Sequence, residues 1–196
     1  MLRAIAEHFT LQADVGFLKA KQELVRNKVW RTVFYVHVFS AILTLMAGFT
    51  QFSSYILTEH RKLHRIMGKI YVFNVLFVNF PAGMLLAVYA NGHLPSKIAF
   101  IILDSLWFCF TLKAFWEIRK GNVKRHKQFM MRSYALTLSA ITLRTWKIVL
   151  TSLFVLDPVT LYMIQAWLGF VPNLFFAEWL IRRQRKNASA LKNNRE

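Results

Sequence analysis

The chain has 196 residues, of which 56% are hydrophobic, 15% aromatic and 18% charged, and it carries 26 Lys and Arg against 9 Asp and Glu. This apolar composition excludes a disordered chain, because disordered segments are poor in aromatic residues. The single cysteine, Cys109, excludes a disulfide framework. Soluble domains average about 25% charged residues, so the composition indicates a membrane protein. Cys109 lies inside an apolar run and is expected to be a buried, inert thiol.

Five apolar segments are long enough to cross a bilayer, since a helix needs about 20 residues at a rise of about 1.5 Å each. The breaks between them carry charges or the turn formers Gly, Pro and Asn. The predicted spanning helices cover residues 30–57, 70–90, 97–118, 129–156 and 159–181. We therefore predict an all-α integral membrane bundle of five transmembrane helices.

The polar ends of the chain complete the predicted organisation. Residues 1–28 contain both acidic and basic side chains and are predicted to form an amphipathic N-terminal segment. Residues 29–181 then form the transmembrane helical domain, and residues 182–196 form a basic C-terminal tail.

The basic residues predict the orientation of the bundle. Sixteen of the 26 Lys and Arg lie in residues 61–69, 119–132 and 182–195, which contain no Asp or Glu. Positively charged loops stay in the cytoplasm, so these three segments, including the C-terminus, are predicted to be cytoplasmic.

The same distribution argues against binding of nucleic acid, which needs Lys and Arg clustered on one face of a folded domain. Attraction to anionic lipid headgroups, worth about 1 kcal/mol per basic residue near the membrane surface, explains the charges more simply. We expect membrane lipids as partners at the cytoplasmic face, and a protein partner in the membrane if the Phe-rich outer faces of the helices seat one.

Several short motifs occur in a fixed order along the chain. They lie at 34–37 (FYVH), 48–52 (GFTQF), 64–71 (HRIMGKIY), His126, 131–135 (MRSYA), 142–144 (TLR) and 166–173 (AWLGFVPN). With these motifs, the chain over about residues 15–181 resembles the predicted bacterial membrane proteins catalogued as domain of unknown function 2306. The resemblance implies an integral membrane bundle without an established activity, so function has to be argued from the residues. We expect the membrane to be the bacterial cytoplasmic membrane.

Two predicted helices carry polar side chains at alternating spacings of three and four, which places them on one helical face. One stripe runs through His37, Ser40, Thr44, Ala47, Gln51 and Ser54, and the other through His126, Met130, Ser133, Thr137, Ala140, Arg144, Lys147 and Thr151. For the small residues we favour ordinary contacts between transmembrane helices.

Ionisable residues within a membrane are more informative, because each costs roughly 2.5–3.5 kcal/mol on insertion scales. Counting residues from the predicted helix ends places four polar groups at one level of the outer half: His37, Asp104, Arg144 and Gln165. Pairing of Asp104 with Arg144 is the cheapest way to keep both ionised. This cluster is predicted to be either a small-molecule or proton site, or a structural ion pair.

A second polar cluster is predicted at the cytoplasmic face. It contains Gln51, His64, Arg65, His126, Arg132 and Glu178. His64 and His126, on different helices, can ligate the iron of one b-type haem from both sides. Alternatively, the basic groups bind phosphate of a lipid headgroup or a phosphorylated ligand.

Pro81 and Pro172 lie inside predicted helices and free backbone carbonyl groups there. Asn79 and Asn173 are close enough in sequence to satisfy such groups. Broken helices of this kind also line binding cavities in transporters.

No Cys or His cluster has zinc spacing, and no Gly-rich phosphate loop is present. We therefore favour a non-enzymatic binding or transport-like membrane module with a buried polar cavity and no cofactor. The alternatives are electron transfer through a haem held by His64 and His126, and a structural subunit of a membrane complex.

Overall fold

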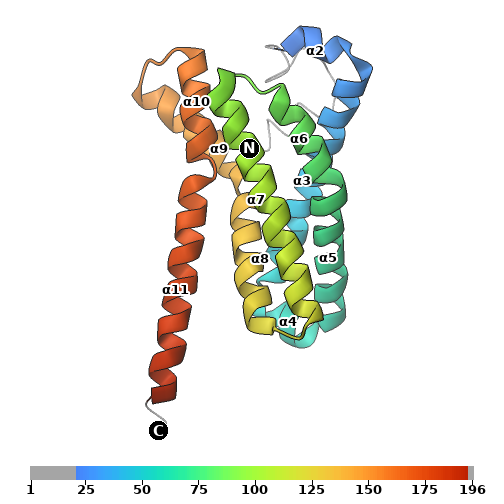
Figure 1. Cartoon of the computed structure of the whole chain (residues 1–196), viewed down its shortest axis with the longest axis vertical. Helices are drawn as coiled ribbons and strands as arrows, with labels where there is room; N and C mark the ends of the chain where they lie inside the picture. The colour runs from blue at the N-terminus through green and yellow to red at the C-terminus, as the bar shows by residue number, and fades with distance from the viewer. Residues whose placement is uncertain (1–20, 194–196) are drawn as a thin grey trace. The chain divides into compact units, whose positions relative to one another are not determined.

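The fold is all-α in the computed structural model, which describes residues 21–193 (Figure 1). Residues 1–20 of the predicted N-terminal segment lie outside the described residues. The part that is described contains helices and no strand, which confirms the predicted class. In chain order the helices are α2 (Gln22–Arg26), α3 (Lys28–Gln51), α4 (Ser54–Glu59), α5 (Arg61–Phe73), the π-helix η2 (Asn74–Asn79), α6 (Phe80–Val88), α7 (His93–Arg119), α8 (Val123–Thr137), α9 (Ser139–Leu153), α10 (Pro158–Leu168) and α11 (Val171–Asn193).

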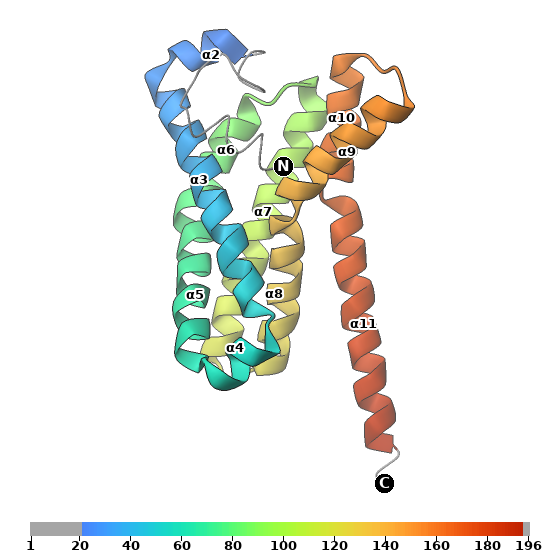
Figure 2. The same ribbon diagram turned by 180° about the vertical axis from the view of Figure 1, so that it is seen from behind.

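The chain divides into two compact units between Asp104 and Ser105, within α7. In the first unit α3 packs against α5, η2 and α6, and the ribbons of Figures 1 and 2 show these helices side by side from both directions. An apolar cluster packs α2 against α3, and it consists of Val25, Trp30 and Phe34. The rings of Trp30 and Phe34 stack with centroids 5.4 Å apart.

In the second unit α8 packs against α11, and α9 packs against α10. The predicted basic tail is helical as far as Asn193, because α11 continues through it.

Side-chain caps set the starts of four of the described helices, one of them α4 with Ser53. Asn27 accepts hydrogen bonds from the backbone N–H groups of Val29 (2.9 Å) and Trp30 (3.3 Å) at the start of α3. Asn122 and Asp157 cap α8 and α10 in the same way. Asn and Asp are favoured there because their side-chain oxygens satisfy N–H groups that have no carbonyl partner within the helix.

Among residues 21–193, four helical stretches are long and apolar enough to cross a membrane: Lys28–Gln51, Arg61–Val88, His93–Arg119 and Pro158–Asn187. The prediction of five such helices is wrong at the fourth, residues 129–156. A break at Leu138 divides this region into α8 and α9, of 15 residues each. A helix of 15 residues is about 22 Å long, too short to span a hydrocarbon core of about 30 Å.

Cys109 is exposed, so the expectation of a buried thiol is also wrong. A helix within a bilayer turns apolar residues toward lipid as well as toward its neighbours. An apolar sequence context therefore does not indicate burial within the protein.

Candidate functional site

The first unit contains a buried network of polar side chains on α3 and η2, which we call the α3–η2 polar network: Ser40, Thr44, Asn74 and Asn79. The Ser40 hydroxyl donates to Asn79 Oδ1 (3.0 Å), and Asn79 Nδ2 donates to Thr44 Oγ1 (3.0 Å). Asn74 Nδ2 donates to Thr44 Oγ1 (3.2 Å) and to the Ser40 carbonyl (3.1 Å). Thr44 and Asn79 are fully buried, so these bonds replace those that water would supply.

The π-helical turn of η2 brings the two asparagines together. In an α-helix, residues five apart are separated by about 140° around the axis, whereas a π-helix pairs residue i with i+5. Asn79 Nδ2 also donates to the Asn74 carbonyl (3.2 Å). The prediction that Asn79 satisfies the carbonyl freed by Pro81 stays a prediction, because the carbonyl that Asn79 contacts is that of Asn74.

Asp104 of α7 is buried against Gly83 of α6. Asp104 is only 7% exposed. A Cβ atom added at Gly83 would lie only 2.4 Å from Asp104 Oδ2. Only glycine therefore leaves room for the carboxylate. Among the described residues of the first unit, Asp104 has no hydrogen-bond or ion-pair partner.

His37 lies on α3 beside the same part of the π-helical turn. Its ring lies close enough to the Asn79 backbone to interact with it, while its Nδ1 atom is buried without a partner among the described residues. Asn79 and Gly83 are four residues apart, which is one helical turn. His37 and Asp104 therefore lie next to neighbouring turns of one helix. We call the α3–η2 polar network together with these two residues the first-unit polar cluster.

Sequence reasoning identified His37 and Asp104 but missed Asn74 as a polar-cluster residue. It treated Ser40 and Thr44 as ordinary helix contacts, and it considered Asn79 only as a proline partner. The available signal was the spacing of five between Asn74 and Asn79, which is meaningful only if the helix has π geometry.

The other two members of the predicted outer-half cluster belong to the second unit. Arg144 is exposed on α9, and its Nη1 atom donates to the Ala140 carbonyl one turn earlier. Gln165 on α10 is 9% exposed, and its Oε1 atom is buried without a partner among the described residues. The pairing of Asp104 with Arg144 stays a prediction.

The second unit has its own partly buried polar contacts at the two helix breaks. Asn173 Nδ2 donates to the carbonyls of Ala135 (3.1 Å) and Gly169 (3.2 Å) and to Thr142 Oγ1 (3.0 Å). Ala135 precedes the break at Leu138, and Gly169 lies between α10 and α11. Asn173 thus satisfies a carbonyl between α10 and α11, close to Pro172, although its bond to the Leu168 carbonyl freed by Pro172 stays a prediction.

Part of the predicted cytoplasmic cluster forms inside the first unit. Gln51, at the end of α3, donates from Nε2 to the His64 carbonyl (3.3 Å) on α5. Gly68 lies against the same amide, because a Cβ atom there would be 3.0 Å from Gln51 Oε1. Arg65 is exposed on α5.

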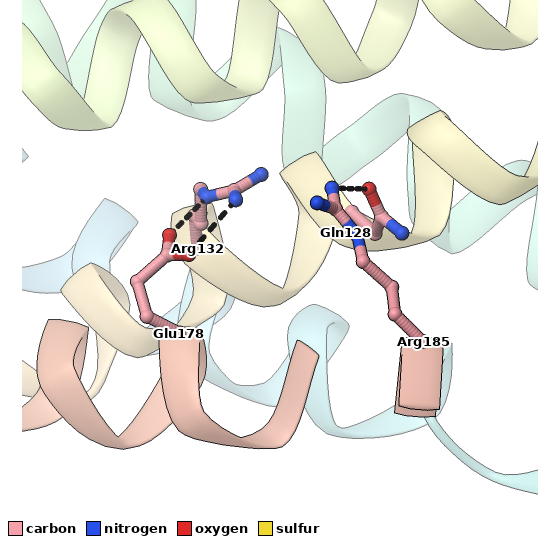
Figure 3. A network of polar contacts seen from close by, with 4 residues as sticks. All are labelled: Gln128, Arg132, Glu178 and Arg185. Carbon is pink, nitrogen blue, oxygen red and sulfur yellow. Dashed lines mark hydrogen bonds and ion pairs between the residues drawn. The ribbon is translucent and has the colours of Figure 1, made fainter. Parts of the chain in front are cut away.

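The remaining residues of that cluster lie in the second unit. Arg132 on α8 binds Glu178 on α11 through both Nε and Nη2, the latter at 3.0 Å (Figure 3). His126 Nδ1 lies 2.8 Å from the Ala114 carbonyl. That contact requires a proton on Nδ1, which leaves Nε2 as the nitrogen with a free lone pair in the neutral ring.

The described residues contain no group of three or more His, Cys, Asp or Glu side chains placed to hold a metal ion. Neither a curated protein nor a solved structure matches the chain. The model of the family described as "Predicted membrane protein (DUF2306)" matches residues 34–181, which include η2, the Gly83–Asp104 contact and the Arg132–Glu178 pair. The match covers most of the chain and agrees with the motifs and the four apolar helices. The chain belongs to the DUF2306 family of predicted membrane proteins.

Proposed function

We propose that the chain is a non-enzymatic binding or transport-like module of the bacterial cytoplasmic membrane. Its binding site is centred on the first-unit polar cluster. The observation that supports this most strongly is the carboxyl group of Asp104, which is buried beside Gly83 without a partner in its own unit.

Burial of an unpartnered carboxyl group opposes folding, because desolvation is not repaid by hydrogen bonds. A purely structural residue at this position would be apolar, since a well-packed hydrophobic side chain is usually as stable as a buried ion pair or more so. An intramembrane acid is therefore a functional group by default. A proton or a small cationic ligand is the species that such a group takes up.

The surroundings of Asp104 support the same proposal. Its neighbour Gly83 follows a π-helical segment, and π-helical turns occur frequently at functional sites. The partnerless Nδ1 atom of His37 is a further polar atom in the same unit that a ligand can satisfy.

Proton movement through reconstituted protein tests the proposal. Liposomes that contain the purified protein and a trapped pH-sensitive dye are driven by a valinomycin potassium potential. We expect Asp104→Asn to slow the protein-dependent proton flux at least tenfold. The control Glu59→Gln removes an exposed acid at the end of α4 and leaves the flux within twofold of wild type.

Equal flux in wild type and Asp104→Asn contradicts the role proposed for this carboxyl group. Absence of any protein-dependent flux in the wild type contradicts the proton-linked form of the proposal.

A b-type haem protein is the second candidate, supported by the contact of His126 with the Ala114 carbonyl. A carbonyl bound to Nδ1 is the usual outer partner of a metal-bound histidine, because it orients the ring and fixes the tautomer. The sequence prediction pairs His126 with His64 as the residues that would hold the haem, and the haem would supply one-electron transfer. A Soret band that is lost in both His64→Ala and His126→Ala supports this candidate, and a colourless folded protein excludes it.

A further inference from the structure

The second unit contains a basic pocket between the start of α8 and the second half of α11. The pocket has a volume of about 300 Å³ and is lined by Asn122, Lys124, Arg125, Gln128 and Arg185. We call this feature the α8–α11 basic pocket.

The two helices meet through a pair of contacts that differ in charge (Figure 3). Arg132 of α8 binds Glu178 of α11, so this contact is neutral. Further toward the pocket, Arg185 Nη2 donates to Gln128 Oε1 at 2.6 Å. Gln128 positions the guanidinium group but supplies no negative charge, so Arg185 stays cationic beside a neutral amide.

Acidic groups do not balance the other cations of the pocket. Lys124 and Arg125 are exposed, and the nearest acid recorded for either is Glu117, whose Oε1 atom is 3.9 Å from Arg125 Nη1. At that distance, and with the Arg125 side chain 67% exposed, the pair is weak. Three cations therefore converge on a space that holds a surplus of positive charge.

We propose that the α8–α11 basic pocket binds a phosphate group. Arginine forms paired hydrogen bonds to phosphate oxygens, and lysine adds a point charge. Because the Gln128 oxygen accepts from Arg185, the amide has its N–H groups left to donate. A volume of about 300 Å³ is at the lower end of the range for small-molecule sites, which suits a headgroup.

The position of the pocket along the chain agrees with a phosphate at the membrane border. Asn122 follows the apolar stretch that ends at Arg119, and Arg185 lies near the end of the stretch Pro158–Asn187. Lipid phosphates lie at such borders, so the phosphate comes either from an anionic lipid or from a soluble phosphate compound.

Thermal unfolding in detergent with defined probes tests the proposal and separates the two sources. The lipid probe is dioctanoyl phosphatidic acid, compared with dioctanoyl phosphatidylcholine, and the soluble probe is inorganic pyrophosphate. We expect at least one phosphate probe to stabilise the wild type in a saturable manner. Arg185→Gln is expected to weaken the apparent affinity at least tenfold.

Arg183→Gln is the matched control, because Arg183 lies two residues away on α11, stacks over the Trp179 ring and does not line the pocket. It should change the affinity less than twofold. A second variant, Lys124→Gln/Arg125→Gln, alters exposed side chains only and should reproduce the loss even if Arg185→Gln fails to fold.

Saturable binding of phosphatidic acid alone assigns the pocket to a lipid, and binding of pyrophosphate assigns it to a soluble phosphate compound. Equal weakening by Arg183→Gln shows general electrostatic attraction and overturns the proposal. Absence of stabilisation by both phosphate probes overturns it as well.

Discussion

At the scale of single residues, the Thr44 hydroxyl group takes part in three hydrogen bonds of the first-unit polar cluster. Its hydroxyl oxygen accepts hydrogen bonds from both Asn74 and Asn79 and donates to the Ser40 carbonyl at 2.8 Å. Both amides are shielded from water, because Asn79 is fully buried and Asn74 is 7% exposed. The stability of the cluster should therefore depend on one hydroxyl group.

Replacement of Thr44 by valine keeps the shape of the side chain and removes this hydroxyl group. Two buried amide donors lose their acceptor, so we expect Thr44→Val to lower the free energy of unfolding by about 1–3 kcal/mol. Thr145→Val is the matched control, because the exposed Thr145 hydroxyl donates only to Ile141 of its own helix. Denaturant titration in micelles measures both, and equal losses would show that the network contributes nothing.

At the scale of helices, Asp157 illustrates how one side chain sets a helix start. Its carboxylate interacts with the Thr160 side chain and accepts hydrogen bonds from the backbone N–H groups of Thr160 and Val159. These interactions hold the pKa of Asp157 below its ordinary value. Because the folded pKa is depressed, the stabilisation of α10 is complete above the unfolded pKa and is lost as the pH falls through the folded value.

A carbon-13 NMR titration of the carboxyl group in micelles tests this cause directly. We expect the pKa of Asp157 to lie below the ordinary value of about 3.9. Thr160→Val removes the largest contribution and should raise the pKa toward that value. An unchanged pKa in Thr160→Val would show that the backbone N–H groups alone produce the shift.

The sequence predicted the helices well where one helical periodicity runs through the whole apolar segment. Apolar length located the helical stretches that include α3, α7 and α10, and the motif order identified the family. The break at Leu138 was not predicted, because neither Pro nor Gly lies there. The α3–η2 polar network was not predicted either, because Asn74 and Asn79 share a face only in a π-helix.

Burial was the least predictable property of the candidate site. Asp104 and Cys109 both lie in the apolar helix α7, yet Asp104 is buried and Cys109 is exposed. The difference depends on which face of α7 meets another helix, and Gly83 alone makes room for a carboxyl group. A single sequence does not show which face of α7 meets another helix.

At the scale of the whole molecule, the basic segments predict the topology. In a Cys109→Ala background, cysteines at Lys62 and Gly121 should be shielded from an impermeant thiol reagent in intact cells. A cysteine at Asn91 should be labelled. Labelling at Gly121 but not at Asn91 would invert the orientation.

The broken region of α8 and α9 needs its own topological test. The six basic residues of 182–195 favour a cytoplasmic C-terminus, which requires α8 and α9 together to carry the chain across the membrane. Cysteine at Val155 should then be labelled and cysteine at Ser189 shielded. The opposite pattern would show that α8 and α9 return the chain to the cytoplasmic side.

The central claim is that Asp104 presents a carboxyl group that can accept and release a proton within the membrane. Dicyclohexylcarbodiimide adds to protonated carboxyl groups in apolar surroundings and forms a stable N-acylurea, which peptide mass spectrometry locates. We predict modification at Asp104 in the reconstituted wild type, to the same extent in Arg144→Gln. An Asp104 that reacts only in Arg144→Gln would contradict the account, because it would show a carboxylate held in an ion pair.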